Sequence, residues 1–289
     1  MANTRQIKRR ITASQNISKI TKAMEMVAAS KMKRAQDQAL AARPYSRALE
    51  QSLQKLASNT DHSLHPLLST HGNGIDIAVL FSTDKGLCGS LNTNLLKAAL
   101  QWQKLHPNGE FVVIGRKAVA FCRIFGLPIH AQFTELPEVI GPKDMLSVST
   151  LLMDQFLQQK FKSVHLIYMD FVNTLSQQLR SIQLLPLTQN ENYQGDTVQF
   201  TTTTAEYTFE PNAKAILGDL LPYYVENAIY QTMLEAKASE HSARMVAMKN
   251  ASENAAELVE ELRLIYNKTR QASITNELLD ITTALLTLS

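Results

Sequence analysis

Glycine is confined to the middle of this 289-residue chain, and this distribution limits what the two ends can form. Residues 1–71 and 219–289 contain no glycine, whereas all ten glycines fall within residues 72–218. Glycine commonly ends helices and forms tight turns, because its backbone reaches conformations that other residues avoid. Its absence from both ends predicts two long uninterrupted helices that flank a compact central domain.

Hydrophobic spacing supports a helix at each end. The apolar positions of the N-terminal segment recur every three or four residues, at Ile17, Ile20, Met24, Ala28, Met32, Ala35, Ala39 and Ala42. Those of the C-terminal segment are Ile229, Met233, Ala236, Ala243, Ala247, Ala251, Ala255, Leu258, Leu262, Ile265, Ala272 and Leu279. An average step of about 3.6 residues predicts one apolar stripe along each helix.

The expected helices are too long for a small domain. A helix over residues 4–58 would be roughly 80 Å long, and one over residues 212–286 roughly 110 Å long. We therefore expect the two ends to pack on each other as a slim antiparallel coiled coil, with two ordinary bundle helices as the alternative. Pro44 is expected to kink the first helix or to restart it after Ala42.

Composition indicates a folded chain outside the secretory pathway. Hydrophobic residues make up 45% and charged residues 19% of the sequence, which is typical of a globular protein. No apolar run approaches the length that spans a bilayer, and the first residues lack the apolar core of a signal peptide. Cys88 and Cys122 are expected to be free structural thiols, with a regulatory disulfide as the alternative.

Positive charge is concentrated in the first helix. Residues 1–34 hold nine Lys or Arg residues and one acid, Glu25, which gives this segment a local charge near +8. A solvated face, nucleic acid and an acidic protein surface are all compatible with such a segment. The lack of interleaved aromatic residues makes single-stranded nucleic acid the weaker choice.

The middle of the chain alternates strand and helix patterns. The expected strands are residues 75–82, 111–115, 163–171 and 179–187, and the expected helices are residues 91–105, a segment ending near Gly126, and residues 144–160. This alternation predicts a parallel sheet, with residues 179–187 as a candidate antiparallel edge. The predicted organisation is an N-terminal coiled-coil helix (1–58), a small Rossmann-like α/β domain (75–190) and a C-terminal coiled-coil helix (207–289).

The glycine loop after the first strand is the candidate ligand site. Its Gly86 and Gly89 match neither the dinucleotide fingerprint nor a phosphate loop, and no nucleophile and base accompany Asp84 and Lys85. A structural turn is therefore favoured over an active site. The histidines of the preceding connector (His62, His65 and His71) are interpreted as solvated loop residues rather than metal ligands.

Four motifs carry a resemblance to a known family. They are the run from Ile20 to Lys31, the loop from Asp84 to Gly89, the stretch from Ala243 to Lys249, and the stretch from Tyr266 to Leu278. Together they closely resemble the gamma subunit of bacterial F-type ATP synthases, in the same order and over essentially the whole chain.

The resemblance implies a rotor shaft without catalytic residues, cofactor or metal of its own. In that family the coiled coil enters a ring of three alpha and three beta subunits, which hold the catalytic sites. The α/β domain sits with the epsilon subunit on the membrane rotor ring (the c-ring), driven by proton flow. The chain would then be peripheral to the cytoplasmic face of the bacterial inner membrane.

The resemblance also implies contact residues at matching positions. Contacts with the catalytic ring are expected at Met24, Arg244, Arg270, Gln271, Thr275 and Glu277, and contacts near the membrane rotor at Tyr207 and Glu210. The basic first helix would face an acidic loop of the catalytic subunit rather than nucleic acid. A coiled-coil adaptor that binds nucleic acid through this helix is the alternative.

Overall fold

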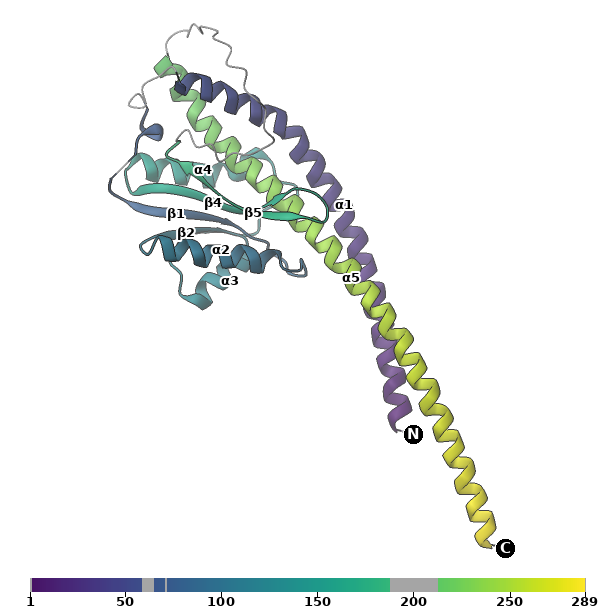
Figure 1. Cartoon of the computed structure of the whole chain (residues 1–289). Coiled ribbons are helices and arrows are strands. Elements are labelled where there is room, and N and C mark those ends of the chain that lie inside the picture. The colour runs from purple at the N-terminus through teal and green to yellow at the C-terminus, as the bar shows by residue number, and fades with distance from the viewer. Residues whose placement is uncertain (1, 59–64, 71, 188–212, 289) are drawn as a thin grey trace. The chain divides into compact units, whose positions relative to one another are not determined.

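The computed structural model describes residues 2–58, 65–70, 72–187 and 213–288, and it divides the chain into two compact units (Figure 1). The helix-pair unit comprises residues 1–29 and 244–289, and the α/β unit comprises residues 30–243. Both unit boundaries fall inside long helices, so each of these helices contributes to both units.

Two long helices form the ends of the chain, as the glycine distribution predicts. Helix α1 runs over Ala2–Ser58 and helix α5 over Ala213–Leu288, with 57 and 76 residues. Pro44 lies inside α1, so the expected restart after Ala42 is wrong. Contacts with α5 on the C-terminal side of this proline support the continuous helix, because the rings of Tyr45 and Tyr223 meet at 6.0 Å and Asn227 donates a hydrogen bond to Ser46.

The α/β unit is built on a five-stranded sheet in the order β3-β2-β1-β4-β5. The strands are β1 (Ile75–Phe81), β2 (Glu110–Ile114), β3 (Ile129–Phe133), β4 (Phe161–Phe171) and β5 (Gln177–Leu185). The first four are parallel and β5 pairs antiparallel with β4, which confirms the expected mixed sheet. Strand β3 was not predicted, because His130 and Gln132 interrupt its apolar run.

Helices cover both faces of the sheet (Figure 1). Helices α2 (Leu91–Leu105) and α3 (Arg116–Phe125) pack on one face, where Trp102 and Cys122 join the strand residues Leu80 and Val113. Helix α4 (Pro142–Leu157), the short 3₁₀ helix η2 (Pro66–Leu68) and the first part of α5 pack on the other.

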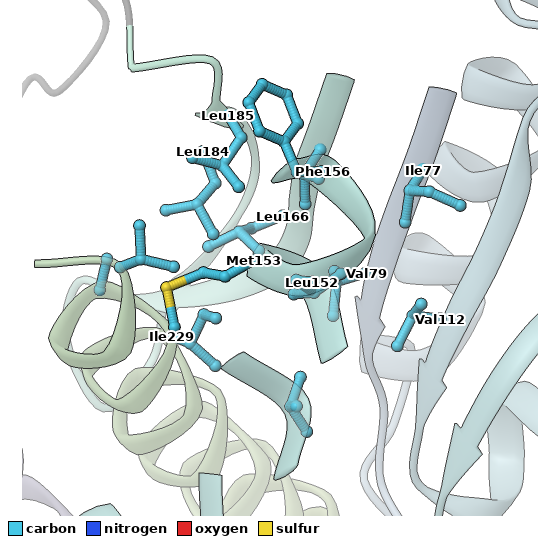
Figure 2. Close-up of a cluster of buried hydrophobic side chains, with 14 of the residues drawn as sticks. Ile77, Val79, Val112, Leu152, Met153, Phe156, Leu166, Leu184, Leu185 and Ile229 are labelled. Atoms are coloured by element: carbon cyan, nitrogen blue, oxygen red, sulfur yellow. The ribbon is translucent and has the colours of Figure 1, made fainter. Parts of the chain in front are cut away.

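The first part of α5 belongs to the domain core. One face of this part of α5 is buried in the same cluster as the strand residues Ile77, Val79 and Leu166, and Figure 2 shows Ile229 among them. Its buried residues are Leu217, Leu221, Val225, Ala228, Ile229 and Met233. The expectation that this helix would bury its stripe only against the other end of the chain is therefore wrong here. A long helix can pack against a sheet along one part and against a second helix along another, since each turn has its own neighbours.

In the helix-pair unit, α1 and α5 meet along seams that differ from the predicted stripes. The buried or half-buried positions recur at alternating steps of four and three: Ile7, Ile11, Ser14, Ser18, Thr21, Glu25 and Ala28 on α1, and Met248, Ser252, Ala255, Val259, Leu262 and Tyr266 on α5. This is the 3.5-residue period of a coiled coil. Five residues that were expected on the stripes are exposed: Ile17, Ile20, Leu258, Ile265 and Leu279. The prediction used apolar residues alone, and the seam also contains serines.

Candidate functional site

The usual ligand crevice of an open α/β sheet is filled in this protein. From β1 the chain adds β2 and β3 on one side of the sheet and then crosses to β4 on the other side, so the strand order reverses at β1. Open α/β sheets bind ligands at such a reversal of strand order. Here the cavity has a volume of only about 10 Å³, and Met233, Lys237 and Glu240 of α5 line it opposite Ser82 and Thr83. This is barely room for one water molecule. Helix α5 therefore fills this crevice.

The glycine loop after β1 is held by hydrogen bonds to its own surroundings. Asp84 Oδ1 accepts from the backbone N–H of Arg116 at 3.0 Å, at the first turn of α3. Thr83 Oγ1 donates to the carbonyl of Lys85 at 2.7 Å and accepts from Asn92 Nδ2 at 2.8 Å. An acid that accepts from a free N–H at a helix start is a capping group. These contacts support the interpretation of the loop as a structural turn.

The cysteines and connector histidines also have structural surroundings. Cys88 and Cys122 are free and buried, as predicted, and burial raises the pKa of the Cys122 thiol to about 11, so little reactive thiolate forms near neutral pH. His65 Nδ1 accepts from the N–H of Leu67 at 3.2 Å and caps η2. His62 and His71 lie outside the described residues. Within the described part of the chain, no group of three or more His, Cys, Asp or Glu side chains could hold a metal ion.

Apolar side chains are unusually exposed on the helix-pair unit. On α1, Met26 and Val27 are 61% and 54% exposed, in addition to the two exposed isoleucines of the predicted stripe. On α5 the exposed apolar residues extend toward the C-terminus as Leu264, Ile265, Ile274, Leu278, Leu279 and Ile281. Contiguous exposed apolar surface marks a site of protein interaction. The end of α5 is therefore suited to a surrounding protein partner.

The start of α1 adds positive charge to this unit. Arg5, Lys8 and Arg9 are exposed, and together with Thr12 and Asn16 they line an open hollow of about 550 Å³. Farther along the helix, Lys22 is paired with Glu25 at 3.0 Å. A row of exposed cations at the helix start attracts an acidic surface.

The predicted contact residues of the helix-pair unit lie in two places. Met24 and Arg244 are half-buried, and the Ser18–Ser252 hydrogen bonds in an antiparallel pair put Met24 about level with residue 246, close to Arg244. Farther along α5, the residues Arg270, Gln271, Thr275 and Glu277 are all exposed. Tyr207 and Glu210 lie outside the described residues.

Sequence reasoning missed the exposed apolar residues that surround these positions. Met26 and Val27 on α1 and Leu264 and Ile281 on α5 were assigned no role, although each lies off the predicted stripe of a long helix. An apolar residue on the solvent side of such a helix is the signal that could have found them. The exposed apolar surface of the helix pair thus extends beyond the residues of the motif matches.

The two units together define a class of protein. An α/β domain whose crevice is filled, joined to helices with exposed apolar side chains, is typical of a subunit of a larger assembly. None of the described helices combines the length and mean hydropathy needed to cross a bilayer.

Comparison with known proteins identifies the assembly. A family model described as ATP synthase matches residues 3–288. An ATP synthase gamma chain of Akkermansia muciniphila is 41% identical over 290 residues, covering 99% of each chain. One of Dehalococcoides mccartyi is 45% identical over 97% of each chain, and one of Haemophilus influenzae 40% identical over 97% of this chain and 98% of the relative. The chain therefore belongs to the ATP synthase gamma chain family, and it is a non-catalytic subunit.

Solved structures share the fold. A chain of the Euglena gracilis mitochondrial ATP synthase, in a structure of its OSCP, F1 and c-ring, aligns with a TM-score of 0.69 at 19% identity and covers 99% of this chain and 95% of that one. A chain from the Tetrahymena thermophila mitochondrial central stalk and c-ring aligns with a TM-score of 0.62 at 24% identity, over 81% of this chain and 99% of that one. Both support the combination of long terminal helices with an α/β domain.

Proposed function

We propose that this chain is the central rotor shaft of an F-type ATP synthase. It would couple proton flow through the membrane rotor ring to ATP synthesis or hydrolysis in the alpha and beta subunits. The observation that carries this proposal is the exposed apolar end of α5, from Leu264 to Ile281, on a chain of the gamma family. Exposure of apolar surface to water is unfavourable in free energy, and a surrounding ring of subunits would bury this surface.

The shaft acts by touching each catalytic site differently. Because its two helices differ in sequence and length, the helix pair presents a different surface to each beta subunit that it faces. A ligand or partner shifts a conformational equilibrium only through different contacts with the two conformations. Rotation of this asymmetric surface would therefore move the three sites through different nucleotide affinities in turn. The residues proposed to make these contacts are Met24, Arg244, Arg270, Gln271, Thr275 and Glu277.

The remaining contacts follow from charge and from the family. The row of Arg5, Lys8 and Arg9 fits the acidic loop that the catalytic subunit of this family presents to its shaft. Tyr207 and Glu210 are proposed to face the c-ring, and the α/β unit to bind the epsilon subunit. Through these contacts the chain would be held at the cytoplasmic face of the bacterial inner membrane, without spanning it.

Reconstitution tests the contact residues directly. Arg270→Ala combined with Gln271→Ala should leave the circular dichroism and melting temperature of the free chain unchanged, because both residues are exposed. In a complex with alpha and beta subunits the same variant should lower ATP turnover several-fold. Glu261→Ala, an exposed residue on the same helix, is the control. Unchanged turnover in the double variant would remove Arg270 and Gln271 from the contact surface.

The basic hollow on α1 also defines the second candidate function, nucleic-acid binding. A chain that binds duplex DNA through three cations should lose affinity steeply between 50 and 200 mM salt. A gel-shift titration of the free chain against this salt series separates the two candidates. The rotor proposal predicts that the chain binds DNA weakly. It also predicts that Arg9→Glu lowers the affinity for DNA no more than it lowers the affinity for the alpha and beta subunits.

A further inference from the structure

Two buried carboxyl side chains meet where α5 crosses the sheet of the α/β unit. Asp170 lies near the end of β4, and Glu235 lies on α5, with side chains 9% and 13% exposed. The two side chains face each other within hydrogen-bonding reach. Ionised carboxylates only accept hydrogen bonds, so a hydrogen bond between them forms only when one of the two carries a proton.

The sheet side of the pair supplies one cation and one hydroxyl. Arg180 of β5 places its Nε 2.8 Å from Asp170 Oδ2, which gives Asp170 a charge-assisted contact. The Tyr168 hydroxyl, on β4, lies within hydrogen-bonding reach of Glu235. The sheet therefore supplies Asp170 with a cation and Glu235 with a neutral donor.

The helix side supplies an amide and a more distant cation. Gln231, one turn earlier on α5, donates its Nε2 to Glu235 Oε1 at 3.0 Å and also reaches the carbonyl of Ala39 on α1 at 3.5 Å. Arg43 of α1 lies 3.7 Å from Glu235 Oε1, and its side chain is one-third exposed. A partly hydrated guanidinium at this distance compensates a buried carboxylate poorly. Glu235 is thus the group that gains most by holding the proton.

We propose that Asp170 and Glu235 form a proton-binding site. In this site the protonated Glu235 donates a hydrogen bond to Asp170, and this bond stabilises the packing of α5 and α1 on the sheet. No assigned role of the chain uses these residues. The elements that meet at the site are α1, α5, β4 and β5. Binding of a single proton therefore affects the packing of both long helices on the sheet. When the proton leaves, two negative charges face each other and the hydrogen bond between them is lost.

The electrostatics place this event near neutral pH. Burial raises the pKa of Glu235 to about 7, with the charge of Asp170 acting in the same direction and the hydrogen bond from Gln231 opposing it. The ordinary value is 4.5, so the folded chain binds this proton more tightly than the unfolded chain does. The resulting stabilisation is complete below about pH 4.5 and is lost as the pH rises through about 7.

The consequence for a rotor rests on the proposed function. If the chain transmits torque, the junction at Asp170 and Glu235 lies between the helices that would turn and the domain that would be driven. Proton loss would make this junction more compliant. The proton site itself can be tested on the free chain, so its failure is distinguishable from failure of the rotor proposal.

Thermal unfolding of the full chain between pH 5.5 and 8.5 tests the site. We expect the melting temperature of the wild type to fall by about 5 °C more over this range than that of Glu235→Gln, which mimics the protonated side chain. Glu226→Gln, half-exposed on the same helix, should follow the wild type. Parallel pH profiles for the wild type and Glu235→Gln would overturn the proposal.

Infrared spectroscopy gives a second measurement that does not depend on stability. The wild type should show the carbonyl stretch of a protonated carboxyl group at pH 6 and lose it by pH 8.5. Glu235→Gln should lack this band at both values, and Glu226→Gln should retain it. Absence of the band from the wild type at pH 6 would also overturn the proposal.

Discussion

The α/β unit and the helix-pair unit bury very different residues. The core of the α/β unit contains large side chains with essentially no exposure, among them Phe111, Phe156 and Phe161. The seam of the helix pair mixes apolar residues such as Val259 with small or polar ones such as Ala28 and Ser252, while other large apolar residues of the same helices are exposed. Apolar burial stabilises in proportion to its area, so the first unit is expected to be stable by itself and the second to depend on partners.

The largest effect should come from the sheet core. Phe156→Ala removes a fully buried ring from the cluster drawn in Figure 2 and should cost about 3–5 kcal/mol in the free energy of unfolding. Leu264→Ala, at a position 71% exposed in the helix pair, should cost less than about 0.5 kcal/mol. Urea unfolding followed by circular dichroism compares the two. Equal costs would show that the helix pair is as self-sufficient as the domain.

The second prediction concerns the apolar end of α5. Leu278→Ser combined with Leu279→Ser should hardly change the unfolding of the free chain, because both side chains are more than half exposed. Association with the alpha and beta subunits should weaken by about 2–3 kcal/mol, since fully burying a leucine is worth about 1.5–3 kcal/mol and each of these two is already partly buried in the free chain. Calorimetric titration measures this, with the exposed Asn267→Ser as control. Unchanged affinity would mean that no partner covers this surface.

The smallest effect is expected within the seam. Ser18 and Ser252 exchange hydrogen bonds with each other's hydroxyl and carbonyl groups at 3.2 to 3.5 Å. Ser18→Ala should cost about 1 kcal/mol, because it removes the hydroxyl that donates to the Ser252 carbonyl and meets the Ser252 hydroxyl. The double alanine variant should cost less than the sum of both single variants, because the contact between the two hydroxyls is then lost only once. Hydrogen exchange of the helix pair provides the measurement, with the exposed Ser30→Ala as control. A double variant as costly as the sum of both single variants would show that the serines act independently.

Much of the fold could be predicted from local patterns. The absence of glycine predicted the two long helices, and the alternation of apolar runs with helical spacing predicted four of the five strands. Strand β3 was missed because its exposure alternates and only its inward residues are apolar. The restart at Pro44 was wrongly expected, because local backbone preference takes no account of the contacts that Tyr45 and Ser46 make with α5.

The candidate sites divide in the same way. The absence of a nucleotide motif could be read from the loop around Gly86, but the filling of the crevice by Met233 and Lys237 could not, since these residues lie about 150 positions away in sequence. Motif matches predicted exposed positions such as Arg270 and Glu277, whose contacts with partners stay predictions. The Asp170–Glu235 pair was not predicted at all, because neither residue stands in a recognisable motif.

The sequence by itself determined what depends on neighbouring residues: two helices of unusual length, a mixed α/β sheet between them, and the family to which the chain belongs. Only the tertiary structure decided which residues of those helices are buried. Helical spacing restricts a side chain to a face of the helix, but whether that face meets a sheet, another helix or water depends on residues far away in the chain. For that reason Ser252 is buried, Leu279 is exposed, and Glu235 lies against a second carboxyl group.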